Sequence, residues 1–220
     1  QYMGESLFVR AYCYYELVNL FGGVPLYTRS LGTGDLNLSR SSAAEVYAQI
    51  EQDLIDAVAV LNPVASQKGR ATKGAAQAFL GKVYLYQNKF TEAAATFDEV
   101  IASGNYSLIP NYNDLFTVAN ENNSETVFDV EYTGLEGGSY GCLICLEGNA
   151  AVGFQGIRQY NGPIYGDGNS YNLPTQELYD AFSSIDPRRN ATILDIDAFI
   201  ATQPNPASIT YAVGAGGHTG

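Results

Sequence analysis

The feature that most constrains the fold is the spacing of small and aromatic residues between positions 80 and 97. Leu80-Gly81 is followed three positions later by Tyr84, and Ala93 is followed four positions later by Phe97. Small residues at Gly81 and Ala93 allow two antiparallel helices to approach closely, and Tyr84 and Phe97 can fill the space between them. The spacing therefore predicts a helical hairpin.

Local signals predict where the two helices of this hairpin begin and end. Thr72 can cap a first helix that runs to about Asn88. Thr91 can cap a second helix that runs to about Ser103, where Gly104 stops it.

The hairpin is similar to a tetratricopeptide repeat, whose pattern is L-G-x2-Y followed by A-x3-F. Gln77 stands at the usual Trp position and Asn105 at the usual Pro position. One such repeat cannot bury its own apolar face, so it needs helical neighbours. We expect these neighbours to be helices at about 5–21 and 42–61.

Apolar periodicity and end signals support these two earlier helices. Gly22-Gly23 and Pro25 end the first, whereas the capping box Ser42-Ala-Ala-Glu45 begins the second and Pro63 closes it. The apolar residues that recur at helical spacing are Leu7, Ala11, Tyr14, Val18 and Phe21 in the first helix, widened by Phe8, Tyr12 and Tyr15, and Val46, Ile50, Leu54, Val58 and Leu61 in the second.

The second half of the chain has a different character. Residues 125–132 alternate as in a short strand, residues 134–174 are rich in Gly, Asn and Tyr, and Thr175 can cap a helix that ends at Asp186-Pro187. Signals after Asp195 are weak. We therefore predict a mainly α protein, with tetratricopeptide-like helix pairs, an irregular loop-rich region and a little β. The predicted division is a helical scaffold at 1–105 and a loop-rich part at 106–220.

Composition excludes several classes of function. The chain has 11 Lys and Arg against 23 Asp and Glu, which gives a net charge of −12. Without a basic cluster it is a poor partner for nucleic acid or for an anionic membrane surface. Neutral ligands such as sugars or peptides remain open. The 17 Tyr suit sugar stacking and interfaces, but Tyr is also an ordinary core residue.

The three cysteines suggest no catalytic chemistry. Cys13 lies in a helical pattern and is expected to be buried. Cys142 and Cys145 have CxxC spacing, but no helix start follows them and no second pair completes a zinc site. A local disulfide and two buried thiols are the alternatives.

Several segments together resemble the SusD/RagB family. The order and spacing of these segments match those of the family along nearly the whole chain, and the combination of segments is specific to the family. They are Arg10–Leu26 with its FGGVPL turn, Arg70–Tyr86, Tyr106–Leu108, Tyr112–Phe116, Asn123–Phe128, Pro174–Phe182 and Asp186–Arg189.

The resemblance implies a non-catalytic nutrient-binding lipoprotein on the outer membrane surface of Bacteroidetes-type bacteria. Such a protein captures oligosaccharides, or peptides in some members, and delivers them to a SusC-like TonB-dependent transporter. No signal peptide, lipid-attachment cysteine or membrane-spanning stretch is visible, and family members are longer. We therefore expect the chain to be part of a longer protein, with the lipid anchor outside it.

The ligand-binding residues are expected in loops, because scaffolds persist while loops vary. Aromatic rings can stack on sugar C–H faces, and planar amides can bond hydroxyl groups. The alternative is that these aromatic residues pack the loops onto the helices. The candidates are Tyr140, Phe154, Tyr160, Asn161, Tyr165, Asn169 and Tyr171.

Two rival functions were weighed against glycan capture. A glycosidase needs two carboxylates across a cleft, and pairs such as Glu131 and Glu136 occur by chance among 23 acidic residues. The single histidine, His218, disfavours histidine-based hydrolysis. A tetratricopeptide adaptor would need several tandem repeats, whereas one clean repeat is visible.

Two charged segments are given structural interpretations. Asp195 and Asp197 are spaced like part of a calcium loop, but the full ligand pattern is missing, so no cofactor is predicted. Asp186-Pro187-Arg188-Arg189 is interpreted as a helix stop with ion-paired arginines, rather than as an anion site.

Overall fold

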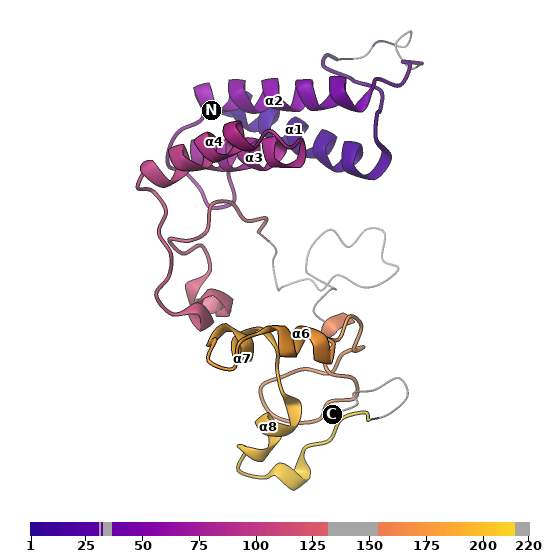
Figure 1. Cartoon of the computed structure of the whole chain (residues 1–220), viewed down its shortest axis with the longest axis vertical. Helices are drawn as coiled ribbons and strands as arrows, with labels where there is room; N and C mark the ends of the chain where they lie inside the picture. The colour runs from indigo at the N-terminus through magenta and orange to yellow at the C-terminus, as the bar shows by residue number, and fades with distance from the viewer. Residues whose placement is uncertain (31, 33–36, 132–153, 214–220) are drawn as a thin grey trace. The chain divides into compact units, whose positions relative to one another are not determined.

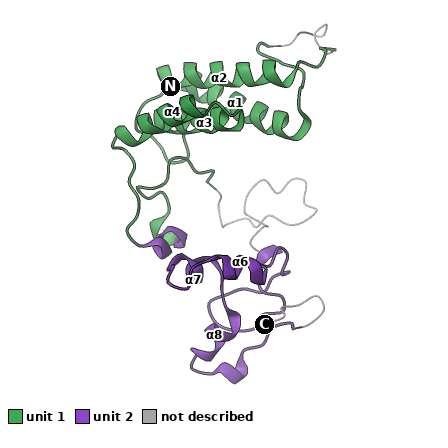
Figure 2. Ribbon diagram, viewed as in Figure 1, with its two compact units in different colours: residues 1–110, 118–131 green, residues 111–117, 132–220 purple. Residues whose placement is uncertain are grey.

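The protein has two compact units, described here from a computed structural model (Figures 1 and 2). The structure describes residues 1–30, 32, 37–131 and 154–213. Unit 1 comprises residues 1–110 and 118–131, and unit 2 comprises residues 111–117 and 132–220, of which 154–213 are described. Each unit has its own cluster of buried apolar side chains.

Unit 1 is helical, and its helices pack in chain order. The helices are α1 (Tyr2–Phe21), α2 (Ala43–Val60), α3 (Lys73–Tyr86), α4 (Phe90–Ala102) and the short 3-10 helix η3 (Val118–Asn120). α1 packs on α2, α2 on α3 and α3 on α4 (Figure 1). Phe8, Ile50, Leu54 and Val83 are among the buried residues between them. The predicted mainly α fold is confirmed.

The helix ends follow the predicted signals, with one exception. Ser42 forms the complete capping box of α2, and the Thr72 hydroxyl caps α3. α4 begins at Phe90, so the prediction that Thr91 caps it is wrong. The reason is a tight turn in which Asn88 adopts φ 60°, so that Lys89 takes the capping position two residues before Thr91.

The hairpin of α3 and α4 has the close contact that the spacing predicts. A Cβ atom at Gly81 would lie 2.6 Å from Cε1 of Phe97, so a larger residue does not fit without movement. Gln77, at the usual Trp position of the repeat, is buried and donates a hydrogen bond to Glu99 across 2.8 Å. A polar link therefore replaces an aromatic contact at this position.

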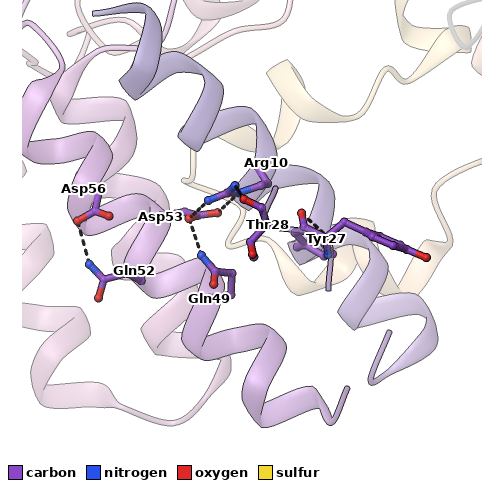
Figure 3. A network of polar contacts seen from close by, with 8 residues as sticks. Arg10, Tyr27, Thr28, Gln49, Gln52, Asp53 and Asp56 are labelled. Carbon is purple, nitrogen blue, oxygen red and sulfur yellow. Dashed lines mark hydrogen bonds and ion pairs between the residues drawn. The ribbon is translucent and has the colours of Figure 1, made fainter. Parts of the chain in front are cut away.

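A buried ion pair joins α1 to α2 (Figure 3). Asp53 is 1% exposed, and its carboxylate accepts hydrogen bonds from Arg10 at 2.6 and 2.7 Å. Gln49 donates a third hydrogen bond to Asp53 at 2.7 Å, and Arg10 donates to the carbonyl of Thr28 at 3.1 Å. The network therefore also holds the start of the loop after α1.

Residues 118–131 belong to unit 1, which differs from the predicted division at 105/106. Val127 packs against the helical core, and the ring of Phe128 lies 5.0 Å from that of Phe8. The predicted strand at 125–132 is wrong for its described residues, 125–131, which form no strand. Side-chain packing on the helices, rather than a backbone ladder, holds this segment.

Cys13 is exposed on α1, so the prediction that it is buried is wrong. The buried face of α1 is formed instead by residues such as Ala11, Tyr14 and Val18. Cys13 lies on the opposite side of the helix from Ala11, two residues away, because successive helical residues are separated by about 100°. Cys142 and Cys145 lie outside the described residues.

Unit 2 consists of short helices and long connections. Its described helices are η2 (Tyr112–Phe116), α6 (Gln176–Ala181), α7 (Arg188–Thr192), α8 (Ile196–Ala201) and η4 (Pro206–Ser208). α7 packs on η2. Its described part includes two isolated β-bridges, Arg158 with Gly168 and Asn161 with Thr210. Its core centres on Ile157, Tyr160 and Ile196.

The ends of α6, α7 and α8 refine the predictions for this region. Thr175 caps α6 as predicted, but α6 ends at Ala181, and Pro187 instead begins α7. Of the two arginines predicted to be ion-paired, Arg188 contacts Asp186 at 2.6 Å, whereas the guanidinium of Arg189 lies over the ring of Tyr179, 4.6 Å from its centre. α8 was not predicted, although the side chain of Asp195 caps it.

Candidate functional site

The candidate site lies in unit 2, on a loop whose two ends are joined by backbone hydrogen bonds. The amide of Tyr171 donates to the carbonyl of Phe154 at 2.7 Å, and the amide of Ser170 donates to Gly156 at 2.8 Å. Arg158 adds a side-chain bond at 2.9 Å to the carbonyl of Asn169. Residues 154–171 therefore form a closed loop held largely by its own backbone.

The backbone of this loop is unusually constrained. Gln159, Ile164 and Ser170 in the loop, and Asn172 directly after it, all have φ between 53° and 75°. This left-handed conformation costs a non-glycine residue about 1–2 kcal/mol, and it is least favourable for a β-branched residue such as Ile164. Such conformations persist only where surrounding contacts impose them, and they concentrate at ligand sites.

Three aromatic rings form a continuous edge-to-face chain between the loop and α8. The ring of Tyr160 lies 6.2 Å from that of Tyr165, which lies 5.1 Å from that of Phe199. Tyr160 is 6% exposed, and its hydroxyl donates to the carbonyl of Pro163 at 2.8 Å. Burial raises the pKa of this hydroxyl. Tyr160 therefore supports Tyr165, whose side chain remains 40% exposed.

A second aromatic pair stands where the loop closes. The rings of Phe154 and Tyr171 lie 6.2 Å apart and are tilted by 34°. Tyr171 is 54% exposed, whereas Phe154 is partly buried. Tyr171 thus presents a large part of an aromatic ring to solvent, with Phe154 beside it.

Two predicted amides are exposed on the same loop. The backbone of Asn161 pairs with that of Thr210, at 2.8 and 3.2 Å, which fixes the residue but leaves its side chain exposed. Asn169 is also exposed, and its backbone is held by Arg158. Exposed planar amides and exposed aromatic rings on one loop suit a ligand that carries both hydroxyl groups and apolar faces.

The structure thus gives the predicted site residues different positions. The exposed members are Asn161, Tyr165, Asn169 and Tyr171, Phe154 is partly buried, Tyr160 is buried, and Tyr140 lies outside the described residues. Sequence reasoning missed Phe199, which supports Tyr165. The capping residue Asp195 and the helical spacing of Ile196, Phe199 and Ile200 were the signal that could have found it.

The acidic residues considered for calcium have other roles. Asp195 caps α8 through a hydrogen bond from Ala198 at 2.9 Å. Asp197 accepts a hydrogen bond from Tyr211 at 2.7 Å, which raises the pKa of that hydroxyl to about 12. Within the described ranges, no group of three His, Cys, Asp or Glu side chains could hold a metal ion. Glu136 and His218 lie outside those ranges.

No helix in the described part of the chain combines the length and apolar character needed to cross a membrane.

Comparison with known proteins identifies the family. Residues 1–85 match a SusD-like family described as "Starch-binding associating with outer membrane". SusD-like protein P2 from Formosa agariphila is 30% identical over 202 residues, which cover 88% of this chain and 38% of that protein.

Solved structures extend the similarity to the fold. A laminarin-binding SusD-like protein is 38% identical with a TM-score of 0.84, over 96% of this chain and 48% of that protein. A SusD-like protein from Bacteroides fragilis is 34% identical with a TM-score of 0.70, over 82% of this chain and 35% of that protein.

The chain spans only a quarter to two fifths of the length of three curated SusD-like relatives, with coverages of 25%, 24% and 38%. The matches nevertheless agree on one family in both sequence and fold, and they include the helical hairpin as well as the loop-rich unit. The chain belongs to the SusD-like (SusD/RagB) family.

Proposed function

We propose that this chain is part of a non-catalytic protein that binds glycans at the cell surface. The observation that carries the proposal is that one constrained loop exposes both two tyrosines, Tyr165 and Tyr171, and the amides of Asn161 and Asn169. Rings stack on the C–H faces of sugars, and amides bond their hydroxyl groups, so neither group needs to perform chemistry. No cofactor is part of the proposal.

The known relatives support a glucan as the first ligand to test. The similar solved structure at 38% identity is a laminarin-binding protein, and the matching family is described as starch-binding. Both polymers are neutral, which agrees with a chain of net charge −12 that would repel anionic ligands.

We also propose a location and a partner for the full-length protein. The family description supports association with the outer membrane, and we place the protein on its outer surface through a lipid anchor outside this chain. A SusC-like TonB-dependent transporter is the proposed recipient of the bound glycan. Copurification of the two full-length proteins from solubilised outer membranes would test this partnership.

Native affinity electrophoresis of the full-length protein in gels with laminarin or starch tests the binding proposal. We expect retardation by at least one glucan. The double variant Tyr165→Ala/Tyr171→Ala should weaken binding about tenfold or more, because each stacked ring contributes about 0.5–1.5 kcal/mol. Tyr12→Ala is the matched control, since Tyr12 is 48% exposed but lies in unit 1.

Other results would favour a different function. Retardation that both variants retain would remove the loop of unit 2 from the site. Binding of peptides but of no glycan would favour a peptide-capturing, RagB-like protein. Release of short oligosaccharides during incubation with the polymer would contradict the non-catalytic proposal.

A further inference from the structure

Unit 1 carries a groove of about 310 Å³ that is separate from the loop of unit 2. Its lining residues come from two segments, within 63–72 and 122–129, and Asn105 and Tyr106 complete the lining. Every lining residue belongs to unit 1. The volume is at the lower end of the range of small-molecule sites, about 300–1,000 Å³.

Two aromatic side chains that line this groove, Tyr106 and Phe128, are fixed by contacts to the helices. The hydroxyl of Tyr106 lies 3.0 Å from that of Thr72, and its ring occupies the space that a Cβ atom at Gly74 would need. Phe128 packs edge-to-face on Phe8 with 5.0 Å between the ring centres. These two side chains of the lining are therefore held in place by the protein itself.

Several polar side chains in the groove have unused hydrogen-bonding capacity. Lys68, Asn122 and Asp129 make no hydrogen bond or ion pair with any other described residue, and the side-chain amide of Asn105 makes none either. Arg70, by contrast, is committed to Glu5, to which its Nε donates at 2.8 Å. The available groups are thus one cation, one anion and two neutral amides.

This combination selects for a particular ligand chemistry. The opposite charges of Lys68 and Asp129 cancel, so the groove has no net attraction for an ion. Donors and acceptors stand beside the apolar side chains of Val64 and Phe128, which are 72% and 38% exposed. A neutral molecule with hydroxyl groups around its edge and C–H groups on its faces satisfies both kinds of surface.

We propose that this groove is a second carbohydrate-binding site, independent of the loop of unit 2, which takes one or two neutral sugar residues. The choice of a sugar over other neutral polar molecules rests on the proposed function. The site itself rests on the groove, the fixed side chains of Tyr106 and Phe128, and its unpaired polar groups.

Chemical footprinting of the full-length protein tests the groove directly. The protein is acetylated with acetic anhydride, with and without a high concentration of maltose or laminaribiose, and modification is read by mass spectrometry. We expect at least one disaccharide to slow acetylation of Lys68 about threefold or more. The reason is that a bound sugar would form a hydrogen bond with the Lys68 amine and shield it from the reagent. Lys73, exposed at the start of α3 and outside the groove, is the internal control and should not change.

Two substitutions test which groups hold the sugar. Asn122→Ala and Asp129→Ala should each weaken the protection of Lys68 about threefold to tenfold, which corresponds to one lost hydrogen bond. Glu121→Gln changes a neighbouring exposed side chain outside the groove and should keep the protection. Equal melting temperatures of the variants would show that folding is unaffected.

The outcomes separate this site from the proposed function. Acetylation of Lys68 at the same rate with and without both disaccharides overturns the second site, even where the intact protein is retarded by glucans. Protection of Lys68 that persists in Tyr165→Ala/Tyr171→Ala supports the second site, whether or not that variant has lost retardation. Protection that disappears in that double variant overturns the independence of the groove.

Discussion

At the scale of single residues, Asp53 is a buried carboxylate that joins α1 to α2 through its ion pair with Arg10. It is buried at 1% exposure, and three hydrogen bonds from Arg10 and Gln49 satisfy its carboxylate. Asp53→Ala would leave the guanidinium of Arg10 partly buried without its partner. We expect the free energy of unfolding to fall by about 3 kcal/mol, measured by urea denaturation with circular dichroism.

The same helix offers a matched control. Asp56 lies three residues later, is exposed, and its side chain accepts a hydrogen bond from Gln52 at 2.8 Å (Figure 3). Asp56→Ala should change the free energy of unfolding by no more than about 0.5 kcal/mol. Equal losses in the Asp53 and Asp56 variants would show that the buried ion pair has no special role.

A second residue-scale prediction concerns stability at acid pH. The hydrogen bonds from the Arg70 guanidinium, and then that from Gln1, hold the pKa of Glu5 below its usual value of 4.5. A carboxyl group with a lowered pKa in the folded state stabilises the protein above its unfolded pKa, and this contribution is lost as the pH falls through the folded pKa. We therefore expect the melting temperature to decrease as the pH falls below about 4.5.

Glu5→Gln tests the source of this decrease. The variant should be less stable than the unmodified protein at pH 7, and the difference should shrink as the pH falls below 4.5. Differential scanning calorimetry between pH 3 and pH 7 measures both effects. A difference in melting temperature that stays constant over this range would show that Glu5 is not a source of the pH dependence.

At the scale of elements, replacing Gly81 in the hairpin of α3 and α4 has two opposing effects on stability, one from helix propensity and one from packing. Helix propensity alone favours Gly81→Ala by about 1 kcal/mol. The added Cβ would, however, lie 2.6 Å from the Phe97 ring, and overpacking of this kind costs about 1–3 kcal/mol. Because the ring is held between two packed helices, we expect net destabilisation, measured as a lower melting temperature.

A double-mutant cycle isolates the contact. Combining Gly81→Ala with Phe97→Ala removes the clash, so the cost of the double variant should be smaller than the sum of the single costs. Additive costs would mean that the two side chains do not interact across the hairpin.

At the scale of the whole molecule, the two units differ in how their structure is stabilised. Unit 1 is stabilised by helices that are consecutive in sequence, whereas unit 2 has short helices and a loop closed by its own backbone. The chain covers 48% of a laminarin-binding relative and includes both kinds of structure. A binding loop needs a backbone that is held in place, and the contacts of Tyr160 and Arg158 supply that support.

Much of the helical unit could be predicted from sequence because its determinants are local. The Ser42 capping box, the Thr72 cap and the contact of Gly81 with Phe97 all depend on residues close in the chain or on the spacing within one hairpin. The predicted cap at Thr91 was wrong because a neighbouring turn starts the helix earlier. The predicted strand at 125–131 was wrong because an alternation of apolar and polar residues can reflect side-chain packing rather than strand pairing.

For the candidate site, by contrast, the sequence indicated which residue types are present but not which of them are exposed. Its aromatic and amide composition was visible in the sequence, and it predicted the region in which Tyr165 and Tyr171 are exposed. Whether a given tyrosine is buried or exposed depends on residues far away in sequence, and Tyr160 is buried because Ile196 and Ile209 pack against it. The same holds for the groove, whose lining comes largely from residues within 63–72 and 122–129.

The sequence by itself therefore determined the order of the helices in unit 1, most of their ends, the close approach of α3 to α4, and the family. Those features follow from caps, spacing and side-chain size within short stretches of chain. Only the tertiary structure decided which tyrosines face solvent and that a groove exists in unit 1. Burial and cavities arise from contacts between distant segments, and such contacts leave no periodic signal in the residues that make them.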